Sequence, residues 1–139
     1  MSRIGLAASL TGIDTNVIVR YMVRDDEAQH AAAAGLLESL SEENPGFVTS
    51  VTLAEVYWLL RRRYRLPVTD CLDAIRKLLE ADVLEFDDDE GAVRALELAE
   101  NGADFADALI HSAFEQFGVI TSVTFDKTAS RRLGWKLLP

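Results

Sequence analysis

Four acidic residues stand at the edges of apolar segments that lie far apart in the sequence. They are Asp14 in LTGIDTNVIVRY, Glu55 in SVTLAEVYWLL, Asp107 in GADFADALIHSAF and Asp126 in VITSVTFDKT. A carboxylate that faces a protein core is costly unless a cation or hydrogen-bond donors compensate its charge. Mg²⁺ and Mn²⁺ prefer oxygen ligands and carry enough charge to hold several carboxylates together. The set therefore predicts a shared divalent-metal site and, with it, chemistry on phosphate groups.

Each of these acids also has an explanation from local structure alone. Glu55 and Asp107 have the spacing of a helix capping box, in which an acid at the third helical position reaches back to the cap. Asp14 could begin an Asx-turn, and Asp126 could cap the short helix that follows it. Capping therefore stays open as an explanation for each residue taken singly.

The helical positions of two of the acids favour the metal hypothesis. Asp107 precedes Ile110 by three positions and Phe114 by seven, so these residues share one stripe of a helix. Glu55 likewise lines up with Trp58 and Leu59. We therefore expect both carboxylates to face the core, where a cation would have to compensate them.

Two neighbours of Asp107 could take part in the same site. Asp104 lies one helical turn earlier; we interpret it as the N-cap of the helix, with a water-mediated role as a fifth metal ligand as the alternative. His111 lies four positions after Asp107 on the same face and could contact a metal ligand. The favoured interpretation of His111 is a solvated or core histidine.

Short apolar runs alternate with longer helical periods, which predicts an α/β domain with a largely parallel sheet. The expected strands are 10–13, 47–49, 83–86, 119–123 and 135–138, and the expected helices are 17–23, 27–40, 52–64, 69–80, 89–100 and 104–117. Ligands of open α/β sheets bind beyond the carboxyl ends of the strands. Asp14 and Asp126 follow strands directly, and Glu55 and Asp107 lie near helix starts, so all four are expected at one edge.

Size and composition indicate one soluble globular domain over residues 1–139. Hydrophobic residues make up 49% and charged residues 27% of the chain. No apolar run approaches the roughly 18 residues of a membrane span, so no membrane partner is expected. We interpret the residues before the first strand as a short leader and not as a signal peptide. The only cysteine, Cys71, fits a reducing cytoplasm and is expected to be a buried small side chain.

The net charge of −9 excludes nucleic-acid binding by broad phosphate neutralisation, so any such contact must be local. The only dense basic run holds Arg61, Arg62 and Arg65, and Lys127 belongs to a second basic group with Arg131 and Arg132. The functional interpretation of Arg61, Arg62, Arg65 and Lys127 is contact with a nucleic-acid backbone. The alternative for the first run is a favourable interaction of cations with a helix C-terminus.

The segments GIDTNVIVRY, TLAEVYWLL, DFADALI and TFDKTA, in this order over almost the whole chain, resemble PIN-domain ribonucleases, most of all the VapC-type toxins of toxin–antitoxin pairs. The resemblance implies a three-layer α/β/α sandwich with a mainly parallel central sheet. It places the family's acidic quartet on the four acids above. It also places small polar residues beside the metal at Asn16 and Thr124.

This resemblance implies a cytoplasmic, homodimeric endoribonuclease that uses Mg²⁺ or Mn²⁺ and is inhibited by a cognate antitoxin. Asp14 and Asp107 would bind the metal directly, with Glu55 and Asp126 in direct or water-bridged support, and an activated water would attack phosphorus. One alternative is a phosphatase with Asp14 as nucleophile, although Asn16 stands where such an enzyme needs an acid. The other is a non-catalytic module that binds a partner protein.

Overall fold

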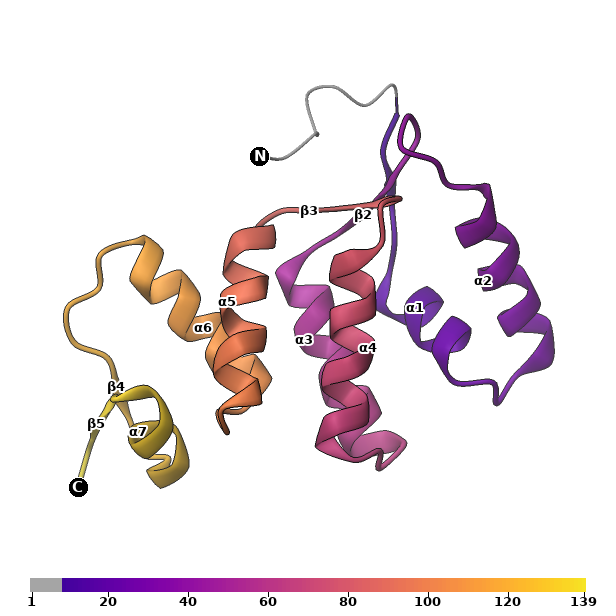
Figure 1. The fold of residues 1–139 in the computed structure, drawn as a ribbon. Coiled ribbons are helices and arrows are strands. Elements are labelled where there is room, and N and C mark those ends of the chain that lie inside the picture. The colour runs from indigo at the N-terminus through magenta and orange to yellow at the C-terminus, as the bar shows by residue number, and fades with distance from the viewer. Residues whose placement is uncertain (1–8) are drawn as a thin grey trace. The chain divides into compact units, whose positions relative to one another are not determined.

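The computed structural model describes residues 9–139, so the leader predicted before the first strand lies outside the described part except for its last residue. The chain divides into two compact units, one up to Asp89 and one from Glu90 onwards. Figure 1 shows the elements of both units in chain order. The single domain expected over residues 1–139 stays a prediction, and each unit is described by itself.

The first unit holds a parallel three-stranded sheet in the order β1-β2-β3. Parallel strands need crossover connections, and helices supply them here. Its elements are β1 (Thr11–Gly12), α1 (Thr15–Met22), α2 (Glu27–Ser39), β2 (Gly46–Val48), α3 (Ser50–Trp58) with a π-helical extension (Leu59–Arg63), α4 (Val68–Glu80) and β3 (Leu84–Phe86). The helices predicted over 27–40 and 69–80 match α2 and α4 closely, although α4 begins one residue earlier than predicted, directly after Pro67.

The face that α3 buries differs from the one predicted. Leu53, Val56 and Tyr57 are buried, and they have the spacing of a core stripe. Glu55 is exposed and Trp58 is 57% exposed, so the expectation that this pair faces the core is wrong. The larger apolar stripe takes the core because it buries more apolar area, which leaves the carboxylate on the flank of the helix.

The start of α3 also corrects the capping-box alternative for Glu55. The N-cap is Thr49, whose Oγ1 accepts the backbone N–H of Thr52 at 3.1 Å. Asp87 adds a second acceptor, with its Oδ1 2.9 Å from the backbone nitrogen of Ser50. Glu55 therefore lies beyond the first turn, and its carboxylate is left for another role.

An ion-pair cluster ties the α1–α2 connection to the segment after α3. The Arg20 guanidinium lies 3.0 Å from Asp25 Oδ1, and the Tyr64 hydroxyl donates to Asp25 Oδ2 at 3.0 Å. Arg61 donates to the Leu66 carbonyl oxygen at 2.9 Å. The intervening Arg65 has a φ of 54°, which is uncommon for a residue other than glycine. These bonds fix the sharp exit of the chain from α3.

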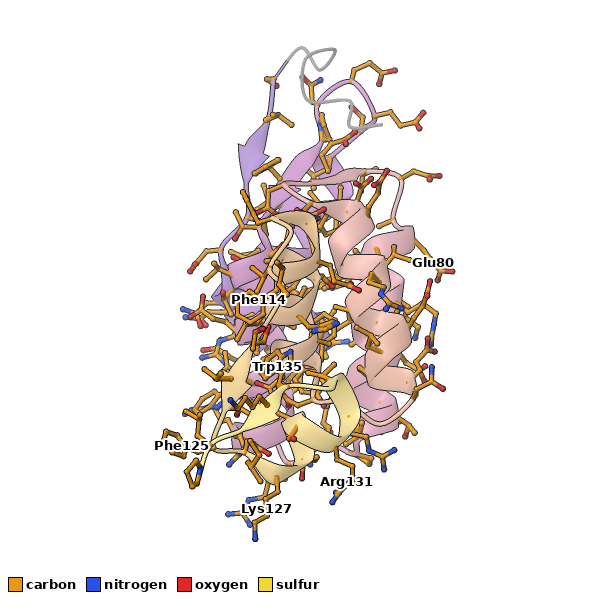
Figure 2. All side chains as sticks on the ribbon, turned by 90° about the vertical axis from the view of Figure 1, so that its left-hand side faces the viewer. Glu80, Phe114, Phe125, Lys127, Arg131 and Trp135 are labelled. Atoms are coloured by element: carbon orange, nitrogen blue, oxygen red, sulfur yellow. The ribbon has the colours of Figure 1, made fainter. Side chains whose placement is uncertain are left out.

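The second unit holds α5 (Asp89–Glu100), α6 (Phe105–Gln116), β4 (Val123–Thr124), α7 (Lys127–Leu133) and β5 (Lys136–Leu137). Its strands β4 and β5 pair in parallel. Trp135 is buried and packs against Phe114, with 5.7 Å between the ring centroids, and Figure 2 shows both side chains. The strand predicted over 119–123 is shorter than expected, because only its end finds a pairing partner among the described residues and β-propensity alone does not form a strand.

The predicted α/β class with parallel strands is confirmed, with the strands divided between two sheets. Cys71 is fully buried, as expected, and burial raises the pKa of its thiol. Within residues 9–139, no helix combines the length and the apolar character needed to cross a membrane.

Candidate metal centre

Asp14 occupies the N-cap position of α1 but does not cap the helix. Its backbone is extended (φ −77°, ψ 156°) and its side chain accepts no capping hydrogen bond. The side chain is exposed. The Asx-turn alternative therefore fails for Asp14, and its carboxylate is free to bind a ligand.

Thr15, the next residue, connects the first two acids of the set. Its side chain is only 5% exposed, and its Oγ1 donates a hydrogen bond to Glu55 Oε1 at 3.0 Å. Asn16, one position further, is exposed. Sequence reasoning missed Thr15. The signal was its place three and four residues before the buried Ile18 and Val19, which puts it on the inward stripe of α1.

Asp104 and Asp107 stand at the start of α6 in the second unit. Asp104 is the N-cap, because its Oδ2 accepts the backbone N–H of Asp107 at 3.0 Å, so the capping interpretation of Asp104 is confirmed. Asp107 is half-buried. Desolvation raises the pKa of the Asp107 carboxyl, and the negative charges of Asp104 and Asp126 raise it further. The fold thus places two like charges, Asp104 and Asp126, close to one partly desolvated carboxylate.

Asp126 caps α7, as the local explanation anticipated. Its Oδ1 accepts the backbone N–H groups of Thr128 at 2.8 Å and of Ala129 at 3.0 Å. Thr124 supports this turn, since its Oγ1 accepts the backbone N–H of Asp126 at 2.9 Å. Because the cap uses one carboxylate oxygen, the other is left for a second interaction.

The donors in both units suit a hard divalent cation. Asp14 and Glu55 belong to the first unit, and Asp104, Asp107 and Asp126 belong to the second. All offer carboxylate oxygens, which are the ligands that Mg²⁺ and Mn²⁺ prefer. In the part of the chain that the structure describes, no three Asp, Glu, His or Cys side chains come together as a complete cation site. The fit to a metal therefore rests on the donor chemistry of each unit.

His111 has a structural partner of its own. The Trp135 indole N–H donates to His111 Nδ1 at 2.9 Å, and His111 Nε2 lies 3.7 Å from a Glu115 carboxylate oxygen. The indole bond requires Nδ1 to be the unprotonated nitrogen. This favours the core interpretation of His111 over the contact with a metal ligand.

The four cations expected to contact RNA differ in their exposure and in their hydrogen bonds within the protein. Arg62, Arg65 and Lys127 are exposed. Arg61 is half-buried and donates one N–H to the Leu66 carbonyl oxygen, so it is the weakest of the four candidates for RNA contact.

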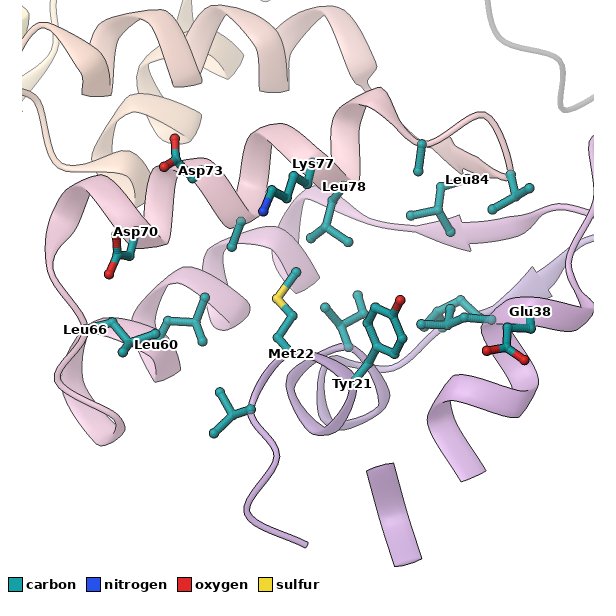
Figure 3. A pocket seen from close by; sticks show the side chains of 17 residues that line it. Tyr21, Met22, Glu38, Leu60, Leu66, Asp70, Asp73, Lys77, Leu78 and Leu84 are labelled. Atoms are coloured by element: carbon teal, nitrogen blue, oxygen red, sulfur yellow. The ribbon is translucent and has the colours of Figure 1, made fainter. Parts of the chain in front are cut away.

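The first unit also contains a sizeable cavity that is not lined by its two candidate ligands, Asp14 and Glu55. It has a volume of about 740 Å³. Figure 3 shows Tyr21 and Met22 from α1 pointing toward Leu78 and Leu84. Its walls are mainly apolar, so the cavity suits an apolar partner and not a metal ion.

The sequence matches the family model of the PIN domain over residues 13–133. No curated protein matches the chain. PIN domains are generally metal-dependent nucleases that act on RNA, in keeping with the hard oxygen donors of both units. The match confirms the PIN-like α/β fold class, and it covers most of the chain. The chain therefore belongs to the PIN-domain family.

Proposed function

We propose that the protein is a metal-dependent endoribonuclease whose metal is held by the acidic residues predicted from the sequence. Asp14 and Asp107 are the direct ligands, and Glu55 and Asp126 act directly or through water. The observation that carries the proposal is the state of Asp107, which is half-buried and repelled by Asp104 and Asp126. A cation would turn this unfavourable cluster into a favourable one.

A bound Mg²⁺ or Mn²⁺ ion supplies Lewis-acid chemistry, since it acidifies a water molecule and offsets charge on the phosphate. Asp14 is poised to bind because no capping bond restrains its carboxylate. Thr15 holds one oxygen of Glu55 and thereby orients the other. Mg²⁺ takes only one or two carboxylates directly, so Asp104 and Asp126, each already engaged as a cap, are suited to water-mediated roles.

The substrate of this proposal is RNA, held by local contacts because the chain as a whole is acidic. Arg62, Arg65 and Lys127 supply exposed cations. Arg61 contributes only its remaining N–H groups. Asn16 and Thr124 stand beside the proposed ligands Asp14 and Asp126 in the sequence.

The proposal extends to a toxin role in the cytoplasm, with an antitoxin as protein partner. The apolar cavity of the first unit supports this, because its volume of about 740 Å³ is open to a partner's apolar side chains. Glu38, Asp70 and Asp73 line it together with a single cation, Lys77. These charges suit a partner helix with an apolar face and basic flanks.

A homodimer is part of the same proposal. The Ala-rich helix α2 leaves Ala28, Ala31 and Ala32 exposed, and a Cβ added at Gly35 would meet no atom within 4 Å. Small side chains let a second helix approach closely. Light scattering on the purified protein tests this directly, and a monomer at all concentrations would remove the dimer from the proposal.

Cleavage of RNA by purified variants in Mg²⁺ or Mn²⁺ tests the central proposal. We expect Asp14→Asn and Asp107→Asn to lower the rate of RNA cleavage by more than roughly 100-fold. A loss of up to that size is typical when a residue that only supports a metal ligand is replaced. Thr15→Val should lose roughly 10- to 100-fold, and Thr15→Ser should recover most of it because it restores the donor. The matched control is Glu97→Gln, an exposed acid on α5.

Two outcomes would contradict the proposal. Cleavage that survives unchanged in Asp14→Asn or Asp107→Asn would exclude the metal mechanism. Turnover of small phosphate esters with a trapped phospho-aspartate at Asp14, and no cleavage of RNA, would favour the phosphatase alternative.

A further inference from the structure

An exposed aromatic side chain stands directly before the Asp126 cap. Phe125 is 75% exposed, although an aromatic side chain offers about 150–250 Å² for burial. Isolated exposed apolar residues are common on protein surfaces. The position of Phe125, beside one of the proposed metal ligands, gives its exposure a chemical context.

The turn that presents Phe125 is held by three hydrogen bonds. Thr124 Oγ1 accepts from the Asp126 backbone nitrogen, and Asp126 Oδ1 accepts from Thr128 and Ala129. The residues that follow Phe125 are therefore held before any ligand arrives. A backbone that is already held on one side of Phe125 reduces the conformational entropy lost when the ring binds a flat partner.

Two exposed cations follow the ring on α7. Lys127 and Arg131 lie four residues apart on α7, on one face of the helix, and both are exposed. Neither forms an ion pair with another described residue. Figure 2 shows Phe125, Lys127 and Arg131 projecting outward from the α7 region.

Helix stability explains only one of these cations. Arg131 lies in the last turn of α7, where a positive charge is favourable. Lys127 is the first residue of α7, where the helix dipole disfavours a positive charge. The helix dipole therefore does not account for the charge of Lys127, which is free to contact an anionic group.

We propose that Phe125 is a base-stacking residue for single-stranded RNA, with Lys127 and Arg131 contacting phosphates that follow the stacked base along the strand. This surface, made of Phe125, Lys127 and Arg131, rests on the proposed ribonuclease function and deepens it. Stacking on an aromatic ring tolerates any base, and cations that track the backbone complete such a site. The surface would hold an unpaired nucleotide next to Asp126, so a base locked in a duplex is a poor substrate.

The test is the affinity for a labelled single-stranded RNA of roughly ten nucleotides, measured by fluorescence anisotropy in chelator so that no metal-dependent cleavage occurs. Phe125→Ala should weaken binding by about 5- to 100-fold, the loss of one stacked base. Phe125→Leu should lose nearly as much, and Phe125→Trp should restore binding. A 2-aminopurine in the RNA should be quenched by the wild-type protein and not by Phe125→Ala.

Phe117 provides the matched control. It is 84% exposed and ends α6, roughly 15 Å along the helix from Asp107. Phe117→Ala should leave the affinity for RNA unchanged. Lys127→Gln should reduce the slope of log affinity against log salt by about 0.7, one phosphate contact to a single strand.

The outcomes separate this inference from the proposed function. If the wild-type protein neither binds nor cleaves RNA, both are overturned. If it binds RNA, and Phe125→Ala matches Phe117→Ala in affinity, only the stacking role is overturned. If Phe125→Ala changes the oligomeric state and leaves the affinity for RNA unchanged, the ring belongs to a protein interface and the inference is equally wrong.

Discussion

Two aspartates, one in each unit, have pKa values shifted in opposite directions. In the first unit the Tyr64 hydroxyl, with help from the Arg20 guanidinium, holds the pKa of Asp25 below its usual range. In the second unit desolvation, and then the charges of Asp104 and Asp126, raise the pKa of Asp107. Asp25 has partners that favour its ionised form, whereas Asp107 has surroundings that oppose it.

The contrast separates an acid that stabilises the fold from one that the fold must tolerate. Asp25 joins the α1–α2 connection to the segment after α3 and needs nothing further. Desolvation and the repulsion from neighbouring carboxylates oppose the ionised form of Asp107, and a bound cation would relieve both. Strained electrostatics of this kind are typical of functional sites. The contrast can be tested by changing the metal, a helix cap or the pH and measuring the stability of variants in each unit.

The largest expected effect is the stabilisation by metal. An ion at about 100 times its dissociation constant should stabilise the wild-type protein by about 2.7 kcal/mol. Asp107→Asn should lose most of this stabilisation, because it removes a ligand and the charge repulsion that the ion relieves. Asp25→Asn should keep it, since Asp25 is paired within the fold. Thermal melts with and without Mn²⁺ measure the difference, and an equal loss in both variants would contradict the contrast.

A smaller effect is expected from the caps. Asp126→Ala should destabilise the metal-free protein by about 0.5–2 kcal/mol, because α7 loses its N-cap acceptor. Asp14→Ala should stay within about 0.5 kcal/mol, since Asp14 makes no capping bond. Urea unfolding in chelator gives both values.

Asp126→Asn serves as the internal control, because Asn caps as well as Asp does. It should retain the stability of the wild-type protein while RNA cleavage falls. If Asp14→Ala lost as much stability as Asp126→Ala, Asp14 would also be stabilising the fold. The contrast between Asp14 as an unrestrained ligand and Asp126 as a helix cap would then be wrong.

The sequence predicted the fold class, because the apolar periodicity on which it depends is a local property of the chain. Apolar periodicity located α2, α4 and α5, and the polar residues at strand ends located Asp14 and Asp126. The sequence did not predict which side of α3 would be buried. Two stripes of that helix carry apolar side chains, and only packing against the rest of the unit selects one.

The Thr15–Glu55 hydrogen bond was equally out of reach of the sequence. Its partners are forty positions apart, and a threonine between two polar residues carries no sign of its partner. The strand expected over 119–123 failed for the same reason. Pairing is a property of two segments, whereas propensity is a property of one.

The smallest effect is the one that separates the two aspartates most cleanly, and it depends on pH. The raised pKa of Asp107 means that its ionisation destabilises the metal-free fold at neutral pH, so Asp107→Asn should be more stable than the wild-type protein there. This advantage should shrink as the pH falls through the raised pKa and vanish below about pH 4, the ordinary value for Asp.

The lowered pKa of Asp25 gives the opposite sign. Asp25→Asn should be less stable than the wild-type protein at neutral pH, with the difference intact down to about pH 4 and lost only as the pH falls through the lowered pKa below it. Urea titrations of both variants in chelator, from neutral to acidic pH, measure the two windows. Because the windows lie on opposite sides of the ordinary pKa, one curve cannot imitate the other. A single shared window would mean that Asp107 is as well compensated as Asp25, and the electrostatic support for a cation at α6 would be lost.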